Sequence, residues 1–289
     1  MQNYLILMLA VVLMALDNAI RKRFQITSGT SLSAGLYFNV VLGGSAALLF
    51  WLVNGLHLSF APYSLLLAFL QAALAVGYTV IGFRVMQESV SIYALFLMTG
   101  SMIIPWLWGV FFLKEVPSFL QVCGLILILA AIFVSKGGAS QMKRRLLPLS
   151  LAVFFLNGLA AIITKLHQIE TIHATVARMD FLVWVNIAKL VISAAALLIV
   201  PGFRSEFSLG SISFQKMLPI ILCTAVSGTA YFLQLTSASK VHATIMYPMI
   251  TGGGVICSML CAWIFFRERP TGRMLTGAVL CLIGTLFYL

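Results

Sequence analysis

The chain repeats itself, and each copy of the repeat holds an odd number of apolar segments. Phe111–Pro117 recurs 153 positions later as Ile264–Pro270. Further pairs share this offset or, nearer the start of each half, an offset of 143: Tyr78 and Tyr231, Gly124 and Gly277, Lys22 and Lys165, Gln25 and Gln168, Phe38 and Phe181. An odd-numbered bundle duplicated in tandem must place its second copy upside down in a membrane. The repeat therefore predicts two halves of inverted topology.

Each half consists of long apolar stretches. Apolar residues form 62% of the chain and charged residues 9%, whereas soluble domains average about 45–50% and about 25%. A helix needs about 20 residues to cross a bilayer, so ten helices fill the 289 residues. We expect a multi-pass integral membrane protein in a lipid bilayer, specifically a prokaryotic inner membrane. The net charge of +11 is expected to anchor loops at anionic lipid, with no nucleic-acid partner.

The apolar stretches predict ten transmembrane helices. They run approximately over residues 3–20, 32–54, 62–83, 90–113, 118–135, 148–166, 178–201, 214–236, 242–266 and 271–289. The predicted fold is an all-α membrane protein with ten transmembrane helices in two inverted five-helix repeats. The repeats cover residues 1–137 and 148–289, joined by a basic linker over residues 138–147. We expect them to form one transmembrane domain and the protein to be a monomer.

Enzymatic chemistry finds little support in the sequence. The seven acidic residues are scattered singly and the four histidines are isolated, whereas a membrane-embedded enzyme acting on lipid-linked substrates usually needs clustered acids or histidines. The five cysteines fall inside apolar runs without metal-site spacing, which favours a packing role. The P-loop of an ATP-driven pump is missing from the sequence. We therefore predict no enzyme, no catalytic or metal-ligating residue and no cofactor.

The repeated segment places a basic residue and a glutamate just before a proline in both halves. Such a sequence breaks one apolar helix at the membrane surface and starts the next, because proline is tolerated in the first helical turn. Glycines, which allow close contact between helices in lipid, follow the segment or lie within spans four and nine: Gly124, Gly277, Gly100 and Gly252–Gly254. The segment thus predicts a structural element at the end of each half.

Ten spans in a five-plus-five arrangement, with this segment and a glycine-bearing last helix closing each half, resemble the drug/metabolite transporter superfamily. Within it the chain is similar to the EamA-like ten-span group over essentially its full length. The resemblance implies a secondary active transporter that works by alternating access around a central cavity lined by both halves. It also implies that the substrate is a small molecule, namely a metabolite, an amino acid or an amphipathic drug, and that the transporter exports it.

Two points of function stay open at the sequence level. The small multidrug exporters of this superfamily resemble one half and carry a coupling glutamate in their first span. The matching region here offers Asp17, without an acidic counterpart in span six, so protons are one candidate coupling ion. A lipid-carrier flippase is the alternative function. A lateral opening lined by apolar side chains would favour the flippase, and a closed polar cavity would favour the exporter.

Ionisable side chains inside the spans are the first candidates for substrate binding or coupling, because such groups usually face a cavity or a partner. Asp17 either pairs with Arg21 one helical turn away or forms a proton or cation site. Lys189 lies in the middle of span seven, too deep for easy snorkelling to the surface. We expect it to face a cavity or to pair with Asp17 or Asp180. Asp180 itself either caps the start of span seven or joins the site.

Uncharged candidates follow from the repeat. Tyr78 and Tyr231 occupy equivalent positions in spans three and eight, and in inverted repeats such residues approach the pseudo-twofold axis near the midplane. They either line the cavity, where a ring suits cations or aromatic groups, or simply pack with the hydroxyl bonded to the backbone. The remaining polar and aromatic candidates are Gln71, Asn39, Asn157, Trp184 and Tyr247.

The distribution of charges and the family resemblance predict opposite orientations of the protein in the membrane. Most Lys and Arg residues fall in the loops that follow the odd-numbered spans, which by the positive-inside rule places both termini outside the cytoplasm. The family resemblance instead implies that both termini are cytoplasmic.

Overall fold

The computed structural model describes residues 2–28, 31–88, 90–136, 146–199, 214–267 and 271–288. Ten helices and no strand occur in this part of the chain. The helices are α1 (Gln2–Ser28), α2 (Leu32–Val53), α3 (Pro62–Glu88), α4 (Val90–Phe111), α5 (Phe119–Lys136), α6 (Leu147–Ile169), α7 (Arg178–Ile199), α9 (Phe214–Ala238), α10 (Ala243–Phe266) and α11 (Gly272–Leu286). The prediction of an all-α protein with ten helices is confirmed. The stretch predicted as a linker, residues 138–147, lies mainly outside the described residues, which also leave out 200–213.

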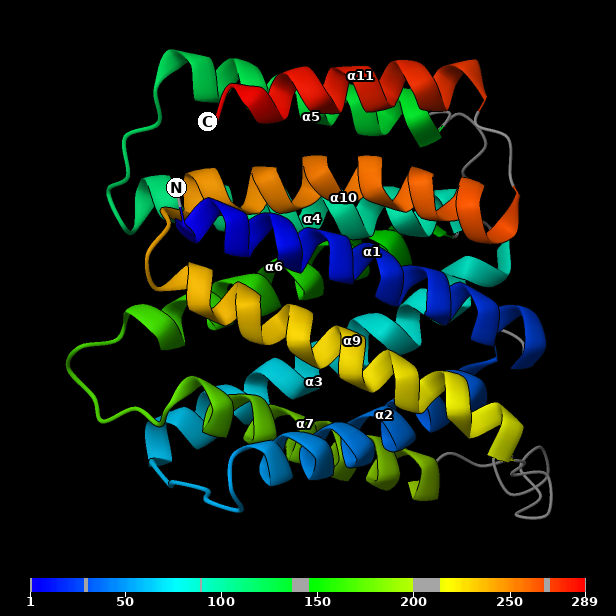
Figure 1. Ribbon diagram of the computed structural model, residues 1–289, viewed down its shortest axis with the longest axis vertical. Coiled ribbons are helices and arrows are strands. Elements are labelled where there is room, and N and C mark those ends of the chain that lie inside the picture. The colour runs from blue at the N-terminus through cyan, green and yellow to red at the C-terminus, as the bar shows by residue number, and fades with distance from the viewer. Residues whose placement is uncertain are drawn as a thin grey trace.

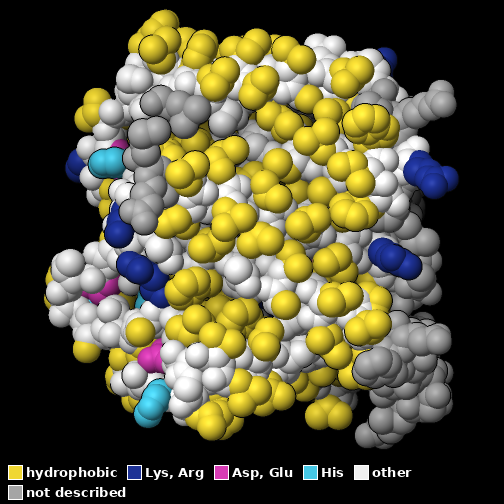
Figure 2. Space-filling view, in the orientation of Figure 1, with side chains coloured by type: hydrophobic (Ala, Val, Ile, Leu, Met, Phe, Trp, Pro, Cys, Tyr) yellow, Lys and Arg dark blue, Asp and Glu magenta, His cyan; other side chains and the backbone are white. Residues whose placement is uncertain are grey.

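The helices carry the surface expected of membrane spans. Within the described ranges, seven are long and apolar enough to cross a bilayer, and three shorter apolar helices, at Phe96–Phe111, Phe119–Val134 and Gly272–Leu286, accompany them. Figure 2 shows hydrophobic side chains covering the middle of one face, with Lys and Arg side chains near the ends of the helices. An apolar surface of this extent marks contact with lipid. The protein is therefore a multi-pass membrane protein.

The bundle interleaves the two halves of the chain. α1 packs against α9 and α10, and in the same way α6 packs against α3 and α4. α2 packs on α7 at one edge of the bundle, and α5 packs on α11 at the opposite edge (Figure 1). Both chain termini lie at the same end (Figure 1). The interior is consequently lined by helices from both halves.

The repeated segment has the same backbone conformation at the two positions where it is described. Lys114 has φ 57° and Arg267 has φ 52°, and this left-handed conformation is uncommon for residues other than glycine. After Lys114 the backbone N–H of Glu115 donates to the carbonyl of Gly109 at 3.1 Å, which ends α4 in the manner of a left-handed C-terminal cap. The following residues of the second copy, Glu268, Arg269 and Pro270, lie outside the described residues.

The turn between α9 and α10 is held by an acid from the loop between α4 and α5 and by a base from α6. The carboxylate of Glu115 accepts the backbone N–H groups of Ala243 and Thr244, both at 2.9 Å. The Lys165 ammonium donates to the carbonyl of Ala238 at 2.7 Å and to that of Val241. A negative charge at a helix N-terminus and a positive charge at a C-terminus complement the helix dipoles and satisfy orphan backbone groups. The repeated glutamate of the first half thus stabilises the scaffold.

Glycines let helix backbones touch at two crossings. A Cβ atom on Gly100 of α4 would lie 2.3 Å from the carbonyl oxygen of Phe154 in α6, and one on Gly158 of α6 would lie 2.7 Å from that of Gly100. Likewise, a Cβ on Gly124 of α5 would lie 2.7 Å from the carbonyl oxygen of Gly284 in α11. Both crossings are the close packing that small residues permit in membranes.

Gly100→Ala should destabilise the protein by about 1–3 kcal/mol, because the added methyl overpacks a backbone contact that has no flexible end to move. Gly254→Ala is the matched control, since a Cβ atom at that helical position would meet nothing within 4 Å. Thermal unfolding of both variants in the same detergent measures the difference. Equal melting temperatures for the two variants would contradict the close crossing of α4 and α6.

Candidate functional site

A charged cluster lies inside the bundle where α1, α2 and α9 meet. The Nε–H of Arg21 donates to Oδ2 of Asp17 at 2.8 Å, one helical turn away, as predicted for this pair. The thiol of Cys223 donates to the other carboxylate oxygen at 2.6 Å. The guanidinium carbon of Arg21 lies 4.8 Å from the ring centroid of Phe38, a cation–π contact. Both oxygens of Asp17 are therefore engaged by the protein itself.

Lys189 extends this cluster from α7. It lies about 16 Å from either end of its helix at 1.5 Å per residue, which places it near the membrane midplane. Its charge interacts with those of Arg21 and Asp17, although α1 and α7 do not pack closely against each other. Among the described residues it forms no hydrogen bond and no ion pair, and its side chain keeps accessible surface. The ammonium thus faces the interior of the bundle without a partner.

Three tyrosines continue inward from the charged cluster. Tyr78 of α3 lies near Arg21 and Asp17, Tyr231 of α9 lies near Tyr78, and Tyr247 of α10 lies near Tyr231. The hydroxyl of Tyr231 lies 3.3 Å from the hydroxyl oxygen of Thr164. Tyr78 and Tyr231, one from each half, provide hydroxyl groups and ring faces near the charges. The hydroxyl of Tyr247 instead donates to the backbone carbonyl of Ala161, and its side chain is buried.

The amide candidates differ in how they are satisfied. Asn39 and Gln71 are buried, and within the described part of the chain neither Nδ2 of Asn39 nor Oε1 of Gln71 has a hydrogen-bond partner. Buried polar atoms are normally paired, so each is a point where water or a ligand group would bind. Asn157 differs, because its Nδ2 donates to the carbonyl of Leu97 at 2.8 Å and ties α6 to α4.

Asp180 and Trp184 lie apart from the charged cluster. The carboxylate of Asp180 accepts hydrogen bonds from Nδ2 of Asn54 and, at 3.2 Å, from the backbone N–H of Ser59. The indole Nε1–H of Trp184 donates to the carbonyl of Ser59 at 2.9 Å. Both residues hold the loop between α2 and α3, so the structure does not bring them together with Asp17 and Lys189.

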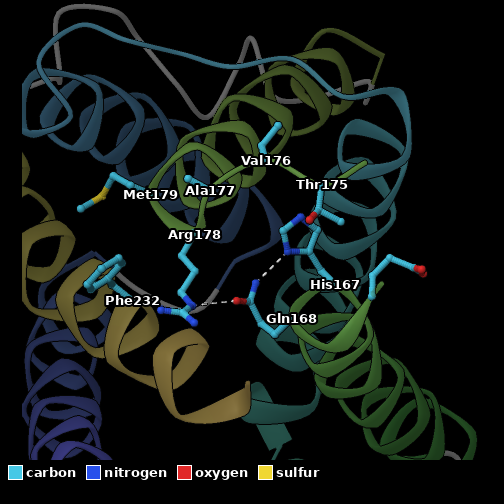
Figure 3. Close-up of a pocket in the computed structure, with 9 residues that line it drawn as sticks. His167, Gln168, Thr175, Val176, Ala177, Arg178, Met179 and Phe232 are labelled. Carbon is cyan, nitrogen blue, oxygen red and sulfur yellow. Dashed lines mark hydrogen bonds between the residues drawn. The ribbon is translucent and has the colours of Figure 1, made fainter. Parts of the chain in front are cut away.

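A cavity of about 480 Å³ opens where α6 and α9 end and α7 begins. Figure 3 shows Gln168 between Arg178 and His167, with Phe232 on the other side of Arg178. The Oε1 of Gln168 accepts a hydrogen bond from Nε of Arg178 at 3.1 Å, and the Nε2 of Gln168 lies 2.7 Å from Nδ1 of His167. A terminal nitrogen of Arg178 also donates to Ser239 at 2.9 Å. The sequence analysis did not predict this cavity. The recurrence of Gln25 as Gln168 was the one sequence feature that pointed to a residue lining it.

Glu170 holds the fold of the loop that borders this cavity. Hydrogen bonds from the backbone N–H of Ile172, at 2.7 Å, and from the Tyr63 hydroxyl hold the pKa of the Glu170 carboxyl at about 2, below its ordinary 4.5. Glu170 is therefore anionic at neutral pH. Its charge is engaged by the loop and is not offered to a ligand. In the described ranges, no group of three or more His, Cys, Asp and Glu side chains is placed to hold a metal ion.

Ten apolar helices, with charged and tyrosine side chains gathered in the interior, are typical of a membrane transport protein. Residues 148–289 match the EamA-like transporter family, which is consistent with a membrane transporter of the drug/metabolite transporter superfamily. The matched segment begins at the residue where the sequence predicts the second repeat to begin.

One solved structure, described only as a crystal structure of a protein, shares this fold over almost the whole chain. It is 14% identical, the match covers 99% of this chain and 96% of that chain, and the TM-score is 0.77. At this identity the similarity shows the fold alone. No curated protein matches the chain.

Proposed function

We propose that the protein is a secondary active transporter that exports small metabolites, amino acids or amphipathic drugs by alternating access. The observation that carries the proposal is the interior cluster of Asp17, Arg21 and Lys189. Ionisable groups at membrane depth are costly and mark substrate or ion pathways. Here two of them come from the first half and one from the second, so a relative motion of the halves changes the distances between them.

We further propose that the halves are inverted repeats related by a pseudo-twofold axis between α2 and α7. Asn186 lies 143 positions after Gly43 and is therefore its counterpart in the second half. A Cβ atom on Gly43 would lie 3.0 Å from the carbonyl oxygen of Asn186. Residues that meet their counterparts lie on a twofold axis. The same offset relates two aromatic contacts, Phe24 on Phe38 at 5.1 Å and His167 on Phe181 at 3.7 Å.

Alternating access then follows from how the halves are joined. Each half supplies its first helix to a groove formed by two helices of the other half, since α1 contacts α9 and α10 while α6 contacts α3 and α4. Rocking one half against the other around the midplane would open the interior to each side in turn. Because one chain holds both halves, this mechanism works in a monomer, which we assign to a prokaryotic inner membrane.

Reconstitution tests the proposed function. The protein purified in detergent is screened by thermal shift against amino acids, amines, nucleobases and quaternary cations, because a bound ligand raises the apparent stability. Solutes that stabilise it are then tested for counterflow into proteoliposomes. Accumulation above that of protein-free liposomes supports a carrier. Stabilisation by a solute that is never moved across the membrane would contradict it.

Asp17→Asn should remove the dependence of transport on a pH gradient. We assign proton coupling to Asp17 because it is the one carboxylate of the interior cluster among the described residues. Asparagine keeps the size of the side chain and can still accept hydrogen bonds, but it cannot bind and release a proton. Transport rates are measured in proteoliposomes with and without an imposed gradient, with Glu170→Gln in the loop as the control. An unchanged pH response in Asp17→Asn would assign the coupling to another group.

A further inference from the structure

The charges in the interior cluster do not cancel. By the ordinary charges of their residue types at pH 7, Asp17 carries one negative charge, and Arg21 and Lys189 each carry one positive charge. The neighbouring Tyr78 and Cys223 are of types that are ordinarily neutral at pH 7. The described part of the cluster therefore holds a surplus of one positive charge.

No described carboxylate is available to neutralise Lys189. Four of the seven acidic residues have described side chains, and all four are engaged elsewhere. Asp17 binds Arg21 and Cys223, Glu115 caps α10, Glu170 folds its own loop, and Asp180 binds Asn54 and Ser59. A cation held deep in a membrane bundle usually faces a partner or a water-filled cavity. An anionic ligand would supply the partner that the described residues do not.

Arg21 is arranged to take part in binding the same anion. Its pairing with Asp17 uses only Nε–H, and the guanidinium has further N–H donors on its two terminal nitrogens. Within the described ranges these terminal groups form no hydrogen bond with the protein, and the side chain is 30% exposed. A planar guanidinium with free terminal donors is suited to the two oxygens of a carboxylate or phosphate. The contact with Phe38 fixes the plane of the group.

We infer that the substrate carries a carboxylate or phosphate group, which Lys189 and Arg21 bind together. This inference rests on the proposed transport function and names its substrate class. Tyr78, near Arg21 and Asp17, is placed to contact the uncharged remainder of the molecule. The cluster thus selects organic anions over amines of the same size, because an added ammonium would meet a surplus of like charge.

Matched ligands test this charge selectivity. The purified protein is titrated in detergent with phenylacetate, its amide and phenethylamine, and with glycerol phosphate and glycerol. We expect at least one anion to raise the melting temperature while its uncharged analogue and the amine do not. Phosphatidylglycerol, compared with phosphatidylcholine, distinguishes a lipid headgroup from a soluble anion as the source of the charged group. Stabilisation by the amine, or by no anion at all, overturns the inference.

Two substitutions locate the anion on Lys189. Lys189→Gln should weaken the Kd of the stabilising anion at least tenfold, the change expected for the loss of one charge-assisted hydrogen bond, whereas Lys189→Arg should retain binding. Size-exclusion elution establishes that both variants are folded. Anion binding that survives Lys189→Gln overturns the assignment. Transport of an amine would overturn the substrate class alone, and anion binding without counterflow would overturn the transport function alone.

Discussion

Lys189→Ala should abolish transport while the protein remains folded. Removing one partner of a buried charged contact costs about 2–5 kcal/mol, so the transport rate at low substrate concentration should fall by about 30-fold or more. The fold should not suffer, because among the described residues the ammonium forms no hydrogen bond or ion pair that the variant would lose. Counterflow in proteoliposomes and thermal unfolding in detergent measure the two effects separately.

The control for this variant is Lys240→Ala. Lys240 is an exposed lysine in the turn between α9 and α10, so its replacement removes the same charge from the chain without reaching the interior. We expect its transport rate to match that of the wild type. Wild-type counterflow by Lys189→Ala would remove this residue from the site. A loss of transport accompanied by a large drop in melting temperature would make its role structural.

The helices could be predicted from the sequence because lipid imposes a simple rule. Each span must be about 20 apolar residues bounded by polar groups, and the predicted sixth span, residues 148–166, lies within α6 (Leu147–Ile169). The pairing of Asp17 with Arg21 was also predictable, since residues four apart in a helix face the same side. Both predictions depend on local spacing alone.

The surroundings of the charged cluster could not be predicted, because they depend on how helices rotate against each other. Cys223 lies 206 positions after Asp17, and no local spacing relates them. Cys223 is buried in an apolar cluster, in line with the packing role predicted for the cysteines, but its thiol also donates to that carboxylate, which the sequence did not predict. Nor does the sequence distinguish Asp180 from Asp17, since both lie near span ends. Only the packed structure shows that Asp180 holds a loop.

Glu115→Ala should destabilise the protein by about 2–4 kcal/mol. Its side chain is 6% exposed, and it accepts two backbone N–H groups that begin α10. A hydrogen bond to a charged group contributes about 1.5–3 kcal/mol, and leaving buried donors unpaired adds a desolvation cost. The loss would also remove a negative charge that interacts with the buried ammonium of Lys165. Thermal unfolding in detergent should show a melting temperature about 5 °C or more below that of the wild type.

Two control variants test whether the loss of stability comes from the hydrogen bonds that cap α10. One removes only the charge of Glu115, and the other changes an exposed neighbouring residue. Glu115→Gln keeps an acceptor of similar size and should lose only part of the stability, because a neutral hydrogen bond is weaker than a charged one. Lys114→Gln changes the preceding exposed residue, which keeps its left-handed backbone and makes no such contact in the described structure, and it should melt like the wild type. If Glu115→Ala also melts like the wild type, the carboxylate does not cap α10. In that case the recurrence of glutamate at the end of both halves would need a functional explanation.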